Sequence, residues 1–148
     1  MRKHQIEHIC WLEVNWQRPF NLDAVWEALT HLSTLSPRGA VIWEVRGANG
    51  RITHLLGADR TYINKVAQVF RAHGDIQFRE VNSESRTHVR LARQIKVTKP
   101  VLSLNTNLTQ SVTRAGLAAM AGGKNGTEIV LQAMMGRRIA PSPTAGEL

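Results

Sequence analysis

The sequence predicts an α+β protein, with a ferredoxin-like βαββαβ lobe over residues 9–82 and a partial βαβ second lobe over residues 89–139. Three observations lead to this fold class. Several short runs alternate apolar and polar residues, which is the period of a half-buried strand. Other runs place apolar residues at helical spacing, and the strand–helix–strand order of the first half begins again in the second. We therefore expect antiparallel sheets with helices packed on one face.

The first strand is predicted over residues 9–16, where apolar residues occupy every second position: Cys10, Leu12, Val14 and Trp16. Glu13 and Asn15 point to the opposite face. Asn21 is a good N-cap for an amphipathic helix that runs to about Leu35.

A hairpin follows, in which the alternating runs Val41–Arg46 and Arg51–Leu56 are joined by the loop Gly47–Gly50. The second helix is expected to open at Gly57–Arg60 and to stop at Gly74. A fourth strand then begins at residue 76, which completes the first lobe.

The polar segment 82–88 is expected to connect the two lobes. The second lobe is predicted to contain a strand over residues 89–98, a helix over residues 108–121 and a strand over residues 128–135. Residues 140–148 carry two prolines and no core-forming pattern, so they are predicted to be a tail or linker.

Composition limits the function classes. The chain has 148 residues and no apolar run long enough to span a membrane, and we see no signal peptide. Its single cysteine, Cys10, excludes an internal disulfide and favours a reducing, cytoplasmic location. The net charge of +8 favours an acidic partner, such as nucleic acid, an anionic membrane surface or an acidic protein, although solvated surface arginines are the alternative.

The search for catalytic motifs finds none. Gly122–Gly126 is glycine-rich, but it ends a predicted helix and precedes a strand, whereas a P-loop follows a strand and opens a helix. The six histidines are scattered, and no serine lies in a nucleophile elbow. Four carboxylates fall singly on outward strand positions and are expected to be solvated: Glu13, Glu44, Glu80 and Glu128. We therefore expect no catalytic residue, metal, cofactor or small-molecule ligand, with an unrecognised enzyme as an open alternative.

Basic residues are the candidate contacts to a partner or to nucleic acid. They are Arg86, Arg90, Arg93, Lys96, Lys99, Arg137 and Arg138. Trp11 and Ile42 are expected to share an outward sheet surface, which leaves binding of single-stranded nucleic acid open.

Several segments resemble the N-terminal region of actinobacterial TraG-like conjugative-transfer ATPases of type IV secretion. The resemblance rests on residues 12–19, 37–47, 89–93 and 130–138. It implies a non-catalytic assembly or docking domain, which precedes a P-loop motor and acts by protein–protein contact at the cytoplasmic face of a membrane secretion complex. The family's nucleotide-binding motifs would lie beyond residue 148, and the interrupted second lobe is expected to continue there. Other secretion components, self-association and DNA are the partners that it implies.

Overall fold

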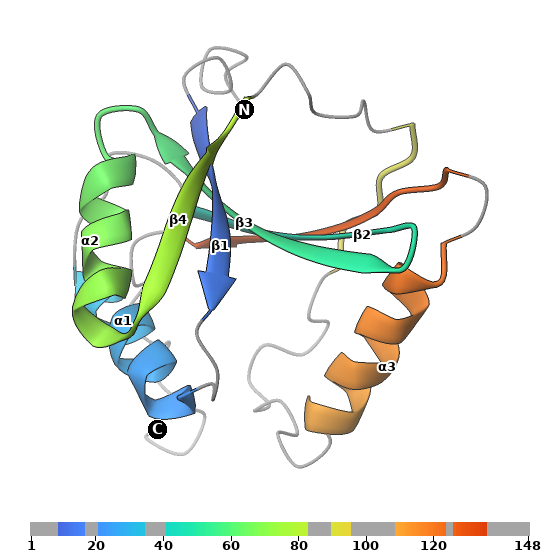
Figure 1. Ribbon diagram of the computed structural model, residues 1–148, viewed down its shortest axis with the longest axis horizontal. Helices are drawn as coiled ribbons and strands as arrows, with labels where there is room; N and C mark the ends of the chain where they lie inside the picture. Colours follow the sequence, from blue (N-terminus) through green and yellow to red (C-terminus); the bar gives the residue numbers. More distant parts are fainter. Residues whose placement is uncertain are drawn as a thin grey trace, which may run out of the picture.

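A computed structural model of the chain describes residues 9–16, 21–34, 41–82, 90–95, 109–123 and 126–135. Its elements are β1 (Ile9–Trp16), α1 (Leu22–Thr34), β2 (Val41–Ala48), β3 (Arg51–Asp59), α2 (Ile63–His73), β4 (Ile76–Val81), α3 (Thr109–Ala121) and β5 (Ile129–Met135). The strands form one antiparallel sheet in the order β4-β1-β3-β2-β5 (Figure 1). This confirms the predicted α+β class, and it makes β4 and β5 the two edges of the sheet.

Local signals account for the first elements. β1 has the predicted bounds, and its alternation sends Leu12 and Val14 into the main core. Asn21 caps α1, because its side-chain Oδ1 accepts hydrogen bonds from the backbone N–H groups of Asp23 at 3.0 Å and Ala24 at 3.3 Å. Phe20, which lies before this cap, is outside the described residues.

The β2–β3 hairpin turns at Asn49 and Gly50, whose φ angles of 50° and 76° are typical of a two-residue turn of type I′. β3 then continues to Asp59, so the expected helix start at Gly57–Arg60 is wrong and α2 begins at Ile63. The reason is tertiary. Gly57 continues the pairing with β1, and a Cβ atom at this position would lie 2.7 Å from the Trp11 ring.

The main core lies between the sheet and the helices α1 and α2. Phe70 of α2 is almost fully buried, and its ring centroid lies 5.9 Å from that of Trp43 and 6.4 Å from that of Trp16. Aliphatic residues complete this core: Leu12, Val14, Leu32, Val41, Leu56, Ile63, Val66, Val69 and Ile76. Burial of such side chains stabilises the fold by about 25 cal/mol per Å² of apolar surface.

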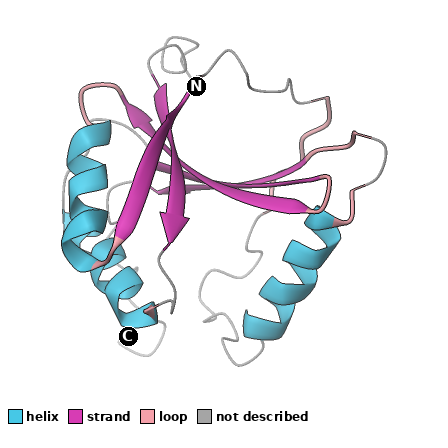
Figure 2. Cartoon of the chain, in the orientation of Figure 1, coloured by secondary structure: helices cyan, strands magenta, loops and turns pink. Residues whose placement is uncertain are grey.

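The last two elements join the same sheet. β5 pairs with β2 along its whole length, from Val41 opposite Met135 to Gly47 opposite Ile129. α3 packs on the hairpin end, where a Cβ atom at Gly47 would lie 2.5 Å from the Met120 backbone. Gly47 and Trp43 lie on one face by alternation, so α3 shares the face of α1 and α2 but lies at the opposite end (Figure 2).

The expected strand over residues 89–98 is wrong for its described part, because residues 90–95 have no regular secondary structure. Leu91 and Ile95 are both exposed, so the apolar residues of this segment do not pack into a core. The edge of β2 that such a strand could join is occupied by β5.

Candidate functional site

The sheet face opposite the helices carries charged residues that are buried. Strand alternation and pairing place one residue of each strand in a row across this face: Arg79, Glu13, Leu55, Glu44 and Gln132. Only 6% of the surface of Glu13 is exposed, and Glu44 is fully buried. The expectation that these two carboxylates are solvated is therefore wrong, since each is held by a charged partner from the same face.

Glu13 lies between two arginines, and we call the three residues the Glu13 clamp. The Nη2 group of Arg51 donates to Oε1 of Glu13 at 3.3 Å. The Nε group of Arg79 donates to Oε2 at 3.0 Å, and its Nη2 group also contacts this oxygen. The side chains of Arg51 and Arg79 are 73% and 71% exposed, so the carboxylate is buried while both guanidinium groups face outward.

The second carboxylate, Glu44, is bound on the other side of the row. The Nε group of Arg46 donates to Oε1 of Glu44 at 2.5 Å, and the side-chain amide of Gln132 donates to Oε2. Arg46 also reaches Oε1 of Glu128 at 3.0 Å. Arg46 and Glu128 are mostly buried, so this is an enclosed network that ties β2 to β5. A buried ionic group of this kind is tolerated only when its partners are in place.

A cavity of about 660 Å³ opens beside the clamp, at the hairpin end of this face. Its polar lining comes from Glu13, Arg46, Asn49, Arg51, Thr53, Arg79, Glu80, Asn82 and Glu128. This volume lies within the range of about 300–1,000 Å³ that is usual for small-molecule sites. Charged groups and ligand-sized space therefore coincide at this end of the sheet face.

The next row on this face is apolar. Trp11, Ile42 and Leu55 form a small buried cluster, with Ile9 and Val81 packed against it. Trp11 and Ile42 do share this face, as expected, but both are buried. The Trp11 ring is therefore covered, which argues against stacking of nucleic-acid bases on it.

β5 forms the apolar edge of the sheet, and no described strand pairs with its outer side. It contains no charged residue, and Leu131 and Met134 are 48% and 67% exposed. The opposite edge, β4, carries Arg79 and Glu80. Charged side chains on an edge strand discourage pairing with another chain, so only β4 has this protection.

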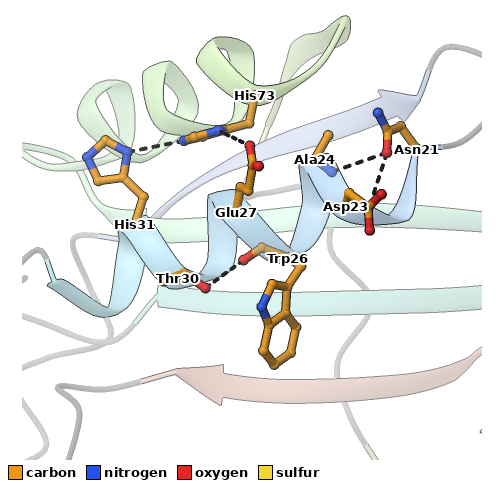
Figure 3. A network of polar contacts seen from close by, with 8 residues as sticks. All are labelled: Asn21, Asp23, Ala24, Trp26, Glu27, Thr30, His31 and His73. Carbon is orange, nitrogen blue, oxygen red and sulfur yellow. Dashed lines mark hydrogen bonds and ion pairs between the residues drawn. The ribbon is translucent and has the colours of Figure 1, made fainter.

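Two histidines that the sequence places far apart meet between α1 and α2 (Figure 3). His31 Nδ1 lies 3.3 Å from His73 Nε2, and His73 Nδ1 lies 3.3 Å from the Oε2 atom of Glu27. Figure 3 shows Glu27 and His31 pointing to α2, whereas Trp26 points away from it. No group of three or more His, Cys, Asp or Glu side chains among the described residues is arranged to hold a metal ion. The contacts of His31, His73 and Glu27 form a polar bridge between α1 and α2.

His54 lies on the helix-covered face, with its ring centroid 5.9 Å from that of Trp43. Burial lowers the pKa of His54 from its usual value of 6.5. Its Nδ1 atom is buried and has no hydrogen-bond partner within the described part of the chain. His54 is therefore a partly buried residue of the central strand β3, on the face that the helices cover.

Few of the predicted basic contacts lie in the described structure. Arg90 and Arg93 do, and both are exposed, with the Nη1 group of Arg93 donating to the Ala92 carbonyl. The others lie outside the described residues: Arg86, Lys96, Lys99, Arg137 and Arg138. Neither Arg90 nor Arg93 lines the cavity.

Sequence reasoning missed the Glu13 clamp. The one local signal for this face was the Glu44-x-Arg46 spacing, which puts opposite charges on the same side of a strand.

Comparisons with known protein families, with curated proteins and with solved structures give no match for this chain. None of the helices in the described ranges is long and apolar enough to cross a membrane.

Proposed function

We propose that this chain is a non-catalytic docking module that contacts other proteins through the exposed edge strand β5. The first four strands, with α1 and α2, have the order β4-β1-β3-β2, and this arrangement supports a ferredoxin-like lobe to which β5 adds a fifth strand. The observation that carries the proposal is the contrast between a charged edge, β4, and an uncharged, apolar edge, β5.

An edge strand offers a row of backbone N–H and C=O groups to an incoming strand. Pairing by strand addition supplies main-chain hydrogen bonds, while alternate side chains supply specificity. On β5, Ile129 and Leu131 lie on the helix-covered face and Met134 lies on the other, so a partner strand would bury apolar surface on both sides. A second copy of this chain, paired antiparallel through β5, satisfies these requirements.

We further propose that the module belongs to a TraG-like conjugative-transfer ATPase and works at the cytoplasmic face of a secretion complex. The support is the resemblance of segments such as residues 37–47 and 130–138 to that family. Any ATPase activity would then reside in a P-loop region outside this chain. The gene tests this directly, because the proposal requires a Gly-x-x-x-x-Gly-Lys-Ser/Thr motif further along the reading frame.

Sedimentation equilibrium tests the β5 contact. We expect the chain to form a dimer that dissociates when Leu131→Lys places a charge on the edge. The matched control is Val112→Lys, which adds the same charge at an exposed apolar residue of α3. A chain that stays monomeric at high concentration, or a dimer unaffected by Leu131→Lys, would contradict self-association through β5.

Nucleic-acid binding is the alternative, favoured by the exposure of Arg90 and Arg93. A salt titration of DNA binding separates the two functions. The alternative requires affinity that falls steeply with salt and a slope that decreases by about one when Arg90→Ala removes a phosphate contact. Absence of binding at low salt excludes it.

A further inference from the structure

We propose that the Glu13 clamp binds the phosphate group of a small phosphomonoester, with the rest of the ligand in the adjoining cavity. The site is formed by Arg51 of β3 and Arg79 of β4, which lie on either side of a carboxylate of the intervening strand β1. It is on the sheet face opposite the described helices, which we call the helix-free face, and it does not depend on the proposed docking through β5.

The two guanidinium groups have hydrogen-bond donors to spare. Each guanidinium carries five N–H donors, and Glu13 occupies one on Arg51 and two on Arg79. Both side chains are more than two-thirds exposed, so the remaining donors are accessible from the cavity that they line. Glu13 also restrains the guanidinium groups of both arginines. This reduces the conformational entropy that the two side chains lose when a ligand binds.

The charges around the clamp favour an anion. One carboxylate between two guanidinium groups leaves one positive charge unbalanced by the ion pairs of the described residues. Arg46, the third arginine of the cavity, lies between two carboxylates, Glu44 and Glu128, so these three side chains together carry a net negative charge. An anion that enters the cavity is therefore repelled by this network and attracted to Arg51 and Arg79.

Of the carboxylates that line the cavity, Glu13 and Glu128 are paired with arginines, whereas Glu80 forms no ion pair with a described residue. Glu80 lies opposite Leu12 in the β1–β4 ladder, so its side chain starts on the helix-covered face of the edge strand. Removal of its charge is expected to strengthen anion binding, which gives the proposal a gain-of-affinity test.

The chemistry of the donors favours a phosphate over a carboxylate. A phosphate monoester presents three terminal oxygens and a charge of about −1.5 to −2 near pH 7, enough acceptors for two arginine forks at once. A carboxylate presents two oxygens and one charge. The neutral groups of Asn49, Thr53 and Asn82 line the remaining space and suit a polar, uncharged ligand body such as a sugar.

The test uses nuclear magnetic resonance of the ¹⁵N-labelled chain, following the arginine side-chain Nε–Hε signals. Inorganic phosphate, a hexose phosphate and a nucleoside monophosphate are titrated separately, each against sodium chloride at equal ionic strength. We expect the Arg51 and Arg79 signals to shift and saturate with all three probes. Tighter binding of the hexose phosphate or of the nucleotide identifies the ligand body, whereas tightest binding of inorganic phosphate limits the site to the free ion and overturns the monoester assignment.

Variants separate the site from general charge effects. Arg51→Lys keeps the charge but loses the planar fork, and we expect affinity to fall about tenfold. Glu80→Gln should raise it about twofold to threefold by removing one exposed charge. Arg114→Lys, the same change at an exposed arginine of α3, is the matched control and should leave affinity unchanged. A thermal melt confirms that each variant is folded. Arginine signals that all move together without saturation, or equal affinities for wild type and Arg51→Lys, would overturn the proposal.

Discussion

The two faces of the sheet are both buried, but they differ in chemistry. The helix-covered face buries aromatic and aliphatic side chains around Phe70 and Leu56, whereas the helix-free face buries Glu13 and Glu44 beside arginines, next to a small apolar cluster around Trp11. Apolar packing is non-directional and tolerates adjustment, but a buried carboxylate requires its partners at fixed positions. We therefore expect the helix-covered face to contribute most of the stability, while the helix-free face can hold a specific polar site.

The largest expected effect is on the apolar face. Phe70→Ala removes a ring that packs against Trp16, Trp43 and Phe78, so we expect the free energy of unfolding to fall by about 3–5 kcal/mol. Urea unfolding measures the change. Phe78→Ala, at a half-buried position of the same cluster, should cost less. An equal cost for the two variants would show that this core is not centred on Phe70.

The next effect tests the polar face. Glu44→Ala leaves the mostly buried Arg46 without its closest carboxylate, and we expect a loss of about 3 kcal/mol. If this face were a solvated surface, the loss would stay within about 0.5 kcal/mol. The triple variant Glu44→Leu/Arg46→Met/Glu128→Gln removes all three charges of this network together. Its unfolding free energy should be higher than that of Glu44→Ala, because no unpaired charge remains buried.

Gly47→Ala tests how α3 is attached to the helix-covered face. A Cβ atom at this position would lie 2.5 Å from backbone atoms of Met120, so the end of α3 must move away from the hairpin. We expect a loss of about 1–3 kcal/mol, as is typical of overpacking. Hydrogen exchange should show faster exchange in α3 with little change in α2. Uniform destabilisation of all three helices would contradict this attachment.

Sequence reasoning was most successful where the signals were local. The alternation of β1, the Asn21 cap and the hairpin turn each depend on neighbouring residues, and each is present in the structure. The turn is shorter than the predicted loop Gly47–Gly50, because Gly47 and Ala48 continue β2. The Glu13 clamp could not be predicted in this way. Its arginines are 38 and 66 residues from Glu13 in the sequence, and a paired, buried carboxylate has the same local pattern as a solvated one. The partner strand of β5 is likewise decided by tertiary packing.

A smaller effect concerns the pH dependence that His54 contributes on the helix-covered face. Burial lowers its pKa in the folded protein below the usual 6.5, so the unfolded chain binds more protons between the two values. Its contribution to stability is therefore full above about pH 6.5 and falls as the pH is lowered toward the folded-state pKa. Thermal melts between about pH 5 and pH 8 should show a weaker pH dependence for His54→Leu than for wild type. Equal slopes would show that His54 titrates normally.

The smallest expected effect lies outside both faces, at the bridge between α1 and α2. Glu27 is two-thirds exposed, and its contact with His73 is 3.3 Å long, so solvent screens the interaction strongly. Glu27→Gln should therefore change the free energy of unfolding by less than about 0.5 kcal/mol. Glu44→Gln is the matched comparison, because it makes the same substitution at a fully buried carboxylate with an arginine at 2.5 Å. Urea unfolding of the two variants should give a much larger loss for Glu44→Gln. Similar losses would contradict the distinction between a screened carboxylate and an enclosed one, on which the description of the helix-free face depends.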